Sequence, residues 1–335
     1  MTIRPLFLLS LPRSGSTLVQ RVLAAHPDIA TAAEPWVLLP HTYATRATGV
    51  YAEYGHALAA RAINEFVAAL PGGEETYRDE LRAFTLRLYE HAAGGAGVYF
   101  LDKTPRYHFI ADELFDLFPD GKFVFLWRNP LSVVASTVET WGRGKWKIGR
   151  WRIDLFDGLA NLVASHERHA GTSLSMRYED LVSDPHTYWP VLFDHLEIPF
   201  DPAILTSFPA VRVPGRFGDP TGVDAYDALT TRSVDKWRAT LANPFRKRWS
   251  RNYLGWIGAE RLAMMGYDLD ELMAELDAVR GGTQRLGSDL VRSSAAWVVR
   301  AGRERGGRLL WESARGGDAR SSYESPTSEG QGSSP

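Results

Sequence analysis

The stretch that decides the fold is residues 6–20, LFLLSLPRSGSTLVQ. It begins with a short apolar run, continues through a turn that contains Pro, Ser and Gly, and ends in a segment with apolar residues at helical spacing. This order predicts a buried strand, a tight loop and a helix. The backbone N–H groups of such a loop and the positive end of the helix dipole converge on one point. The stretch is therefore typical of a phosphate-binding loop.

The side chains of this loop indicate which anion it holds. Arg13 adds a fixed positive charge, and Ser14, Ser16 and Thr17 add hydroxyl donors. The spacing resembles the nucleotide-triphosphate loop GxxxxGK[ST], with Ser10 at its first Gly and Ser16 in place of its Lys. That Lys normally neutralises the β and γ phosphates. We therefore expect an anion other than a triphosphate, and an Arg/Ser-rich turn without a ligand is the alternative.

Composition narrows the class of protein. The 335 residues carry a formal net charge of −2 at pH 7, so no global field points to a nucleic-acid partner. The chain has no Cys, which excludes disulfides and thiolate metal sites and is typical of a reducing compartment. The first apolar run is too short for a signal peptide, and no later segment approaches the ~20 apolar residues that span a bilayer. We expect a cytoplasmic protein.

The pattern predicts one large domain and a tail. Residues 1–280 alternate between apolar strand-like runs and helical patterns, one of which covers residues 51–93. Residues 281–315 form a basic, Trp-containing extension that suits a helix docked on the domain or lying on a membrane. Residues 316–335 are rich in Ser, Gly and Glu and should be disordered. Nothing in the sequence sets the oligomeric state.

Two later apolar runs also end in polar residues that suit a ligand site. Lys103 follows the run 98–101, and Arg128 follows the strongest strand pattern, 123–127. In an open parallel sheet, ligand-facing residues belong at the carboxyl ends of the strands. Arg128 at a strand end, with Ser136 on the following helix, forms a second anion-binding geometry. A surface Lys and a helix-capping Arg are the alternatives.

A phosphotransferase reading also exists for the run that ends at Asp102. An apolar strand followed by Asp imitates the strand that holds magnesium in phosphate-loop kinases. Two features oppose this reading: Lys103 would place a cation beside the supposed metal ligand, and the loop at residues 10–17 lacks its Lys. No cluster of metal-ligating residues is predicted.

Two further segments are candidates for the acceptor side. Glu34 follows a helix stop at residues 26–29. If the first strand and helix are placed as above, the chain has returned across the carboxyl edge of the sheet, and Glu34 lies next to the phosphate-binding loop. A solvated loop residue is the alternative. Residues 141–152 are basic, aromatic and interrupted by Gly. Such a segment can stack on a sugar or a base, lie on a membrane surface, or close the core with its Trp side chains.

Two anion sites on one sheet, without the triphosphate Lys, suit a nucleotide with phosphates at both its 5′ and 3′ ends. The chain resembles sulfotransferases that use 3′-phosphoadenosine 5′-phosphosulfate (PAPS). The resemblance covers about residues 5–240. Its landmarks occur in the family's order: the loop at residues 11–17, Glu34 after His26-Pro27-Asp28-Ile29, Lys103-Thr104-Pro105, Arg128 with Ser136, Tyr178-Glu179-Asp180-Leu181 and Lys236-Trp237.

The resemblance implies an α/β fold with a P-loop NTPase-like central parallel sheet flanked by helices. It implies in-line sulfuryl transfer without a metal, with Glu34 as the base and with Arg13 and Lys103 stabilising charge. Pro105 stands where cytosolic sulfotransferases have a His, and His108 is the reserve base. The residues expected to bind PAPS and its product 3′-phosphoadenosine 5′-phosphate (PAP) are Arg13, Ser14, Gly15, Ser16, Thr17, Arg128, Ser136, Tyr178 and Lys236.

The acceptor does not follow from the resemblance. The Trp-rich segment favours a hydroxyl of a carbohydrate, a glycolipid or a small metabolite over a protein tyrosine. Peripheral membrane contact through residues 141–152 or through the basic C-terminal segment is an option. Besides the kinase, the remaining alternative is a catalytically silent PAP-binding or membrane-adapter protein.

Overall fold

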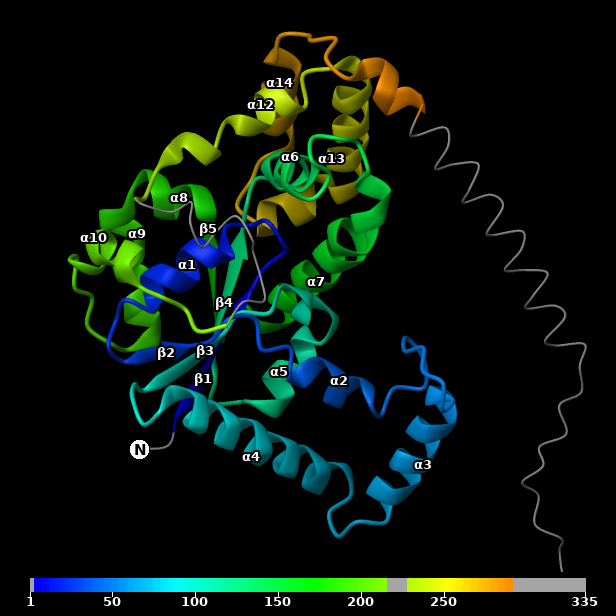
Figure 1. The fold of residues 1–335 in the computed structure, drawn as a ribbon, viewed down its shortest axis with the longest axis vertical. Coiled ribbons are helices and arrows are strands. Elements are labelled where there is room, and N and C mark those ends of the chain that lie inside the picture. The colour runs from blue at the N-terminus through cyan, green and yellow to red at the C-terminus, as the bar shows by residue number, and fades with distance from the viewer. Residues whose placement is uncertain (1–2, 216–227, 292–335) are drawn as a thin grey trace, which may run out of the picture. The chain divides into compact units, whose positions relative to one another are not determined.

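The computed structural model describes residues 3–215 and 228–291. Its centre is a 5-stranded sheet in the order β2-β3-β1-β4-β5, in which every neighbouring pair is parallel (Figure 1). The strands are β1 (Arg4–Leu9), β2 (Ile29–Thr31), β3 (Tyr99–Asp102), β4 (Lys122–Trp127) and β5 (Ser173–Arg177). Helices flank the sheet, which confirms the predicted P-loop NTPase-like α/β fold.

Helices connect the strands and continue after the last one. None of the described helices is both long and apolar enough to cross a membrane. The α-helices are α1 (Ser16–Leu23), α2 (Leu38–Tyr43), α3 (His56–Ala68), α4 (Glu74–Ala93), α5 (Ala111–Leu117), α6 (Pro130–Thr140), α7 (Leu159–His169), α8 (Tyr178–Ser183), α9 (Pro185–Leu196), α10 (Ile204–Ser207), α12 (Lys236–Thr240), α13 (Pro244–Met264) and α14 (Leu269–Ala278). Shorter turns are η1 (Pro105–Phe109), η2 (Ile148–Trp151), η3 (Ile153–Gly158), η4 (Phe208–Ala210) and η5 (Thr231–Ser233).

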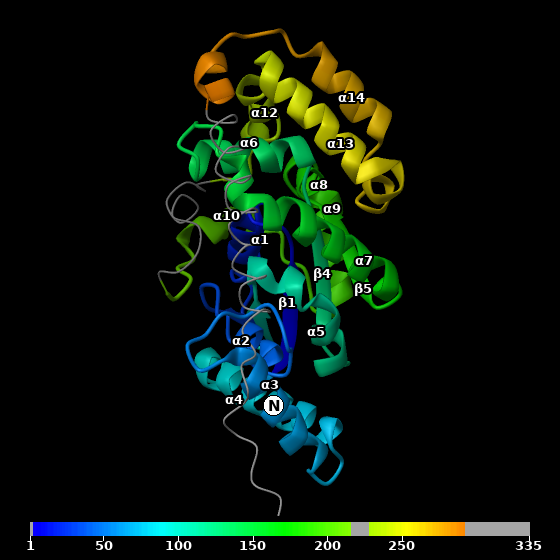
Figure 2. The same cartoon turned by 90° about the vertical axis from the view of Figure 1, so that its right-hand side faces the viewer.

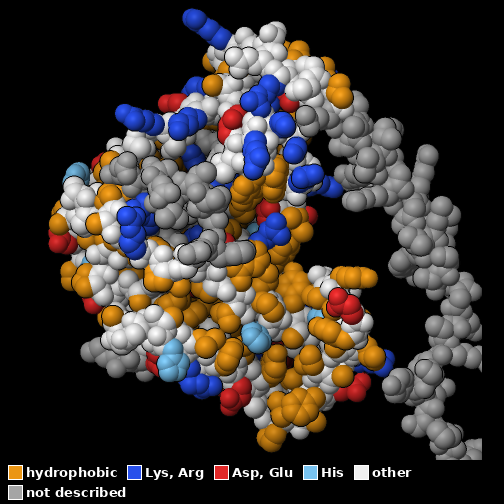
Figure 3. Space-filling view, viewed as in Figure 1, with side chains coloured by type: hydrophobic (Ala, Val, Ile, Leu, Met, Phe, Trp, Pro, Cys, Tyr) orange, Lys and Arg blue, Asp and Glu red, His pale blue; other side chains and the backbone are white. Residues whose placement is uncertain are grey.

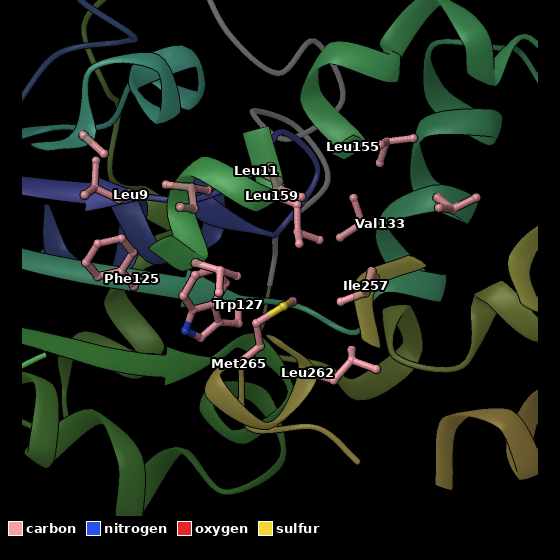
Figure 4. Packing of buried hydrophobic residues seen from close by; sticks show 14 of the residues in the cluster. Leu9, Leu11, Phe125, Trp127, Val133, Leu155, Leu159, Ile257, Leu262 and Met265 are labelled. Carbon is pink, nitrogen blue, oxygen red and sulfur yellow. The ribbon is translucent and has the colours of Figure 1, made fainter. Parts of the chain in front are cut away.

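Both faces of the sheet are buried, which explains why its strands read as continuous apolar runs. Phe7 and Leu9 of β1 pack into a core with α5, α6, α7 and α13. Leu6 and Leu8, which alternate with them, pack into a second core with α1, α8 and α9. Figure 4 shows part of the first core, where Trp127 of β4 lies among side chains from helices and loops distant in sequence. The sheet is thus the middle of three layers, and its edges are the surfaces left for a site.

The C-terminal helices pack on one another as well as on the sheet. Helix α14 lies along α13, and α12 contacts α6 (Figure 2). A buried ion pair joins Arg246 of α13 to Asp289, with 2.7 Å between Nε and Oδ2. The chain is therefore one compact unit through residue 289. The expected basic helix of residues 281–315 lies mostly outside the described residues, and the expected disordered tail of residues 316–335 lies entirely outside them.

Two details of the fold differ from what the sequence predicts. The helical pattern over residues 51–93 is divided between α3 and α4, because Gly72 and Gly73 have φ of 85° and 60° and cannot continue a helix. Strand β2 has only 3 residues, too few for the period-2 signal by which a strand is predicted. It pairs with β3, and this pairing brings the segment that follows β2 to the carboxyl edge of the sheet.

Candidate active site

The loop between β1 and α1 has a backbone that few side chains adopt. Arg13 and Gly15 have φ of 70° and 88°, both in the left-handed region. A Cβ on Gly15 would lie 2.3 Å from a ring atom of Tyr178, so only glycine allows α8 to pack this closely. A strained non-glycine residue such as Arg13 costs about 1–3 kcal/mol and is typical of functional sites.

Strand order places the predicted anion-binding segments side by side. Because β3, β1 and β4 are adjacent and parallel, Lys103, the Arg13 loop and Arg128 follow carboxyl ends at one edge of the sheet. An Nη of Arg128 donates to the Arg13 carbonyl oxygen at 3.0 Å. Arg13 Nε donates to Ser136 Oγ at 3.2 Å. The two anion sites expected from the sequence therefore form one continuous basic region.

A cavity of about 430 Å³ lies against this region, within the size range of small-molecule sites. Arg232 adds a further cation to its lining, and Glu139 is the carboxylate among the described lining residues. The lining includes these residues singled out in the sequence: Arg13, Arg128, Ser136, Tyr178 and Lys236. The excess of cations suits an anionic ligand.

The remaining predicted loop residues have a different position. Ser14, Gly15, Ser16 and Thr17 belong to the described part of the chain but do not line the cavity. Ser14 and Ser16 are buried, and Gly15 is the N-cap of α1. They therefore lie at the positive end of the α1 dipole, where backbone N–H groups are the natural donors to an anion.

Arg128 is held in place by contacts from three directions. Its second Nη donates to the Ser233 carbonyl oxygen at 2.9 Å, and its guanidinium carbon lies 4.5 Å from the centroid of the Tyr178 ring. The Tyr178 hydroxyl is in turn hydrogen-bonded to Ser233 Oγ at 2.8 Å. Arg128 Nε is buried and has no hydrogen-bond partner among the described residues. On the face shown in Figure 3, Lys and Arg side chains gather around α6 and α12, while hydrophobic side chains dominate around α2 and α3.

Glu34 and Lys103 meet at the carboxyl ends of β2 and β3. Lys103 Nζ lies 2.9 Å from Glu34 Oε1, and the side chains are only 3% and 10% exposed, respectively. Trp36 Nε1 donates to the other carboxylate oxygen at 3.2 Å. The structure thus brings two predicted catalytic residues into contact, and the ion pair holds the Glu34 carboxylate on the side of the sheet edge where Lys103 emerges.

Asp102, directly before Lys103, has surroundings that the sequence does not reveal. Its carboxylate accepts hydrogen bonds from the hydroxyls of Tyr89 at 2.7 Å, Thr104 at 2.8 Å and Tyr107 at 3.0 Å. Burial raises the pKa of Asp102 to about 6, and these hydrogen bonds and the Lys103 charge limit the rise. Both oxygens are engaged and the side chain is buried, so Asp102 does not offer them to a magnesium ion as the kinase reading requires.

His108, the reserve base, lies inside the packing between η1 and η3. Its side chain is fully buried, and Nε2 lies 3.3 Å from Asp154 Oδ1. Arg106 forms an ion pair with the same carboxylate at 2.6 Å. The Asp154 carboxylate, itself buried, thus faces the imidazole Nε2 inside this packing.

Two contributors to the site were not assigned to it from the sequence. Ser233 contacts both Arg128, through its carbonyl oxygen, and Tyr178, through its hydroxyl. Trp36 donates a hydrogen bond from its indole Nε1 to the Glu34 carboxylate. No local pattern distinguishes either residue. Trp141 of the Trp-rich segment forms a tilted aromatic pair with Trp151, with 5.7 Å between ring centroids, and the centroid of its ring lies 5.9 Å from the Arg13 guanidinium carbon.

Comparison with known proteins points to one family. The family model described as "Sulfotransferase family" matches residues 5–202. The nodulation protein NoeE of Sinorhizobium fredii (strain NBRC 101917 / NGR234) is 36% identical over 137 residues, which are 41% of this chain and 31% of that protein. The omega-hydroxy-beta-dihydromenaquinone-9 sulfotransferase Stf3 of Mycobacterium tuberculosis (strain CDC 1551 / Oshkosh) is 30% identical over 107 residues, 28% of this chain and 27% of that protein.

The matched segments are short relative to these proteins, since the chain spans less than a third of the length of either curated relative. Among solved structures, the sulfotransferase domain from the curacin biosynthetic pathway aligns with a TM-score of 0.50 and 24% identity. The alignment covers 72% of this chain and 92% of that domain. This similarity supports the fold described above.

Proposed function

The chain belongs to the sulfotransferase family, and on this premise we propose that it transfers the sulfuryl group of PAPS to an acceptor hydroxyl. The observation that carries the proposal is the basic cavity at the carboxyl edge of the sheet, lined by Arg13, Arg128, Ser136 and Lys236. A nucleotide with phosphates at both ends needs cations at two places on one surface, and this cavity supplies them without the triphosphate Lys.

The residues present fit the two ends of the donor. The 5′-phosphosulfate would bind at Gly15 and the first turn of α1, where N–H groups and the helix dipole favour an anion, with the hydroxyls of Ser14, Ser16 and Thr17 close by. The 3′-phosphate would bind Arg128, whose buried Nε–H has no hydrogen-bond partner within residues 3–215 and 228–291.

In the proposed reaction, the acceptor oxygen forms a bond to sulfur while the bond from sulfur to the 5′-phosphate oxygen breaks. The products are a sulfate ester and PAP. Glu34 takes the proton of the acceptor hydroxyl, acting as general base. Lys103 and Arg13 stabilise the charge on the sulfuryl oxygens and on the departing phosphate. Lys103 Nζ lies 2.9 Å from Glu34 Oε1, so the proposed base and one of the stabilising cations are in direct contact.

We propose a hydroxyl of a carbohydrate, a glycolipid or another small metabolite as the acceptor. Two observations support this class over a protein tyrosine. Trp141 and Trp151 form an aromatic pair next to Arg13, and such a pair suits stacking on a sugar or another flat group. The Stf3 relative is named as a sulfotransferase of omega-hydroxy-beta-dihydromenaquinone-9, which is not a protein tyrosine. Cytoplasmic location is part of the proposal and is supported by the absence of Cys.

Calorimetry with PAP, AMP and Mg-ATP tests the donor. PAP should bind at least ~10-fold more tightly than AMP, because only PAP carries the 3′-phosphate that a charge-assisted hydrogen bond can hold. Arg128→Ala should abolish that preference, and Arg61→Ala, on an exposed face of α3, should leave it intact. Tight Mg-ATP binding without a preference for PAP would overturn the proposal in favour of a phosphotransferase.

Transfer from radiolabelled PAPS tests the chemistry. Glu34→Gln should bind PAP normally and lose turnover by roughly 10²-fold or more, a typical general-base effect. His108→Gln should keep turnover close to that of the wild type. The reverse result would move the base to His108, and PAP binding without any transfer by the wild type would indicate the silent binding protein.

A further inference from the structure

We propose that Asp102, Thr104 and Tyr107 are positioning residues that fix the loop carrying Glu34 by holding the backbone on its C-terminal side. The inference rests on the proposed function, in which Glu34 is the base. None of these three residues needs to touch either substrate. They would act through the conformation of residues 34–38, which end the loop after β2 and include the first residue of α2.

Two hydrogen-bond relays connect the Asp102 carboxylate to this loop. In the first, the Trp36 N–H donates to Thr104 Oγ1 at 3.3 Å, and the Thr104 hydroxyl donates to Asp102 Oδ1 at 2.8 Å. In the second, the Leu38 N–H donates to the Tyr107 hydroxyl oxygen at 3.2 Å, and that hydroxyl donates to Asp102 Oδ2 at 3.0 Å. The two carboxylate oxygens thus each support one backbone N–H of the loop.

The polarity of the relays depends on the carboxylate. An ionised carboxylate only accepts hydrogen bonds, so each hydroxyl must donate its proton to Asp102 and keep its lone pairs for a backbone N–H. Asp102, Thr104 and Tyr107 are all buried, and water therefore does not compete for these bonds. In both relays the hydroxyl therefore donates to the carboxylate and accepts from a backbone N–H of the loop.

The loop itself requires such support. Trp36 has φ of 58°, a left-handed backbone conformation that is unfavourable for a large side chain. Conformations of this kind persist only where the surrounding structure determines them. The Trp36 side chain also donates to Glu34 Oε2 at 3.2 Å, so a change at Trp36 would reach the proposed base directly.

Tyr89 provides a matched control within the same network. Its hydroxyl donates to Asp102 Oδ2 at 2.7 Å, the same oxygen that Tyr107 uses. Tyr89 belongs to α4, and no contact between its hydroxyl and residues 34–38 occurs among the hydrogen bonds of the described chain. Tyr89→Phe and Tyr107→Phe therefore each delete one hydroxyl from one carboxylate oxygen, but only Tyr107→Phe removes an acceptor from the loop.

The test compares Tyr107→Phe with Tyr89→Phe, and Thr104→Val with Thr104→Ser, at pH 8. Hydrogen–deuterium exchange of peptides covering residues 33–40 should become at least ~10-fold faster in Tyr107→Phe and Thr104→Val and stay near the wild-type rate in the other two. Sulfuryl transfer is then measured with [³⁵S]PAPS and the best acceptor from a panel of monosaccharides, long-chain alcohols and phenols. Tyr107→Phe and Thr104→Val should lose at least ~10-fold in kcat. Their Kd for PAP should remain within about twofold of the wild-type value.

The exchange measurement does not depend on the proposed function, so the two ideas can fail separately. If wild-type protein transfers no sulfate, the proposed function fails and exchange alone decides whether the relays hold the loop. Equal exchange in Tyr107→Phe and Tyr89→Phe would overturn the inference. Faster exchange in Tyr107→Phe with kcat equal to that of Tyr89→Phe would also overturn it, because the loop would then be held without consequence for the base.

Discussion

The ion pair between Glu34 and Lys103 predicts a large energetic coupling between these two residues. The perturbation is a double-mutant cycle with Glu34→Gln, Lys103→Met and the double variant. Each single change leaves one charge without its partner in a site where the two side chains are 10% and 3% exposed. The double variant removes both charges and keeps side chains of similar size. It should therefore be more stable than the Lys103→Met single variant.

The structure sets the magnitude. Two unit charges at 2.9 Å attract by about 6 kcal/mol at an effective dielectric constant of about 20. Loss of hydration offsets part of this attraction, since removing one partner of a buried pair typically costs about 3–5 kcal/mol and removing both costs far less. Trp36 Nε1 donates to the Glu34 carboxylate, and Glu34→Gln keeps a side-chain oxygen that can accept this hydrogen bond. We therefore expect a coupling of about 2–4 kcal/mol.

Urea unfolding of the four proteins at pH 7.5 measures the coupling, with circular dichroism and tryptophan fluorescence recorded in parallel. Coincident transitions with a constant m-value allow the four free energies of unfolding to be compared. A coupling below about 0.5 kcal/mol would contradict this prediction, because it would equal that of an exposed ion pair. The same result would mean that Lys103 does not hold the Glu34 carboxylate in place in the protein without bound donor.

Three further predictions address the loop, the buried acid and the Trp-rich segment. Gly15→Ala should weaken PAP binding at least ~10-fold, because the added methyl would come within 2.3 Å of the Tyr178 ring. Gly94 also has a positive φ but no close neighbour, so Gly94→Ala should only lower the free energy of unfolding, by about 1–2 kcal/mol. Equal PAP binding by the two variants would contradict this prediction. Burial raises the pKa of Asp102 from 3.8 to about 6. Between these two pH values the folded state therefore binds a proton that the unfolded chain does not. The free energy of unfolding, relative to that of Asp102→Asn, should be highest below pH ~4 and fall by on the order of 3 kcal/mol as the pH rises through about 6. Parallel unfolding curves of the two proteins from pH ~4 to ~7 would oppose that pKa. Trp146→Ala should lower the free energy of unfolding by about 3–5 kcal/mol without changing the Kd for PAP, because Trp146 is only 5% exposed and lies in the core; a weakened Kd would place it at the donor site.

The Trp-rich segment shows how one composition can serve two purposes. Trp146 is buried and packs edge-on against Trp249, with 5.3 Å between ring centroids, which matches the interpretation that such residues close the core. Trp141 and Trp151 are only partly buried and form a tilted aromatic pair, in which Trp141 lies beside Arg13. Their role toward an acceptor or a membrane stays a prediction. The sequence left these interpretations open because nothing local distinguishes a Trp that packs inward from one that lies next to a loop.

Local patterns determined much of the fold. The run, loop and helix of residues 6–20 form β1, the Arg13 loop and α1, because strand and helix periodicities and the need for positive φ at Gly15 act over a few residues. The positions of Lys103 and Arg128 followed from the same reasoning. Arg128 comes directly after an apolar run and Lys103 comes one residue after another, and the carboxyl ends of adjacent parallel strands meet at one edge.

The tertiary structure alone decided the chemistry between these segments. Glu34 and Lys103 are separated by 69 positions, and their contact depends on the pairing of β2 with β3. Asp102 has the sequence context of a magnesium ligand, but hydroxyls from α4, η1 and Thr104 surround it and make it a buried acceptor. Local sequence patterns are enough to predict which groups reach the carboxyl edge of the sheet. Which of them pair, and which are withdrawn from water, is set by burial and by contacts between distant segments, and no periodicity records those contacts.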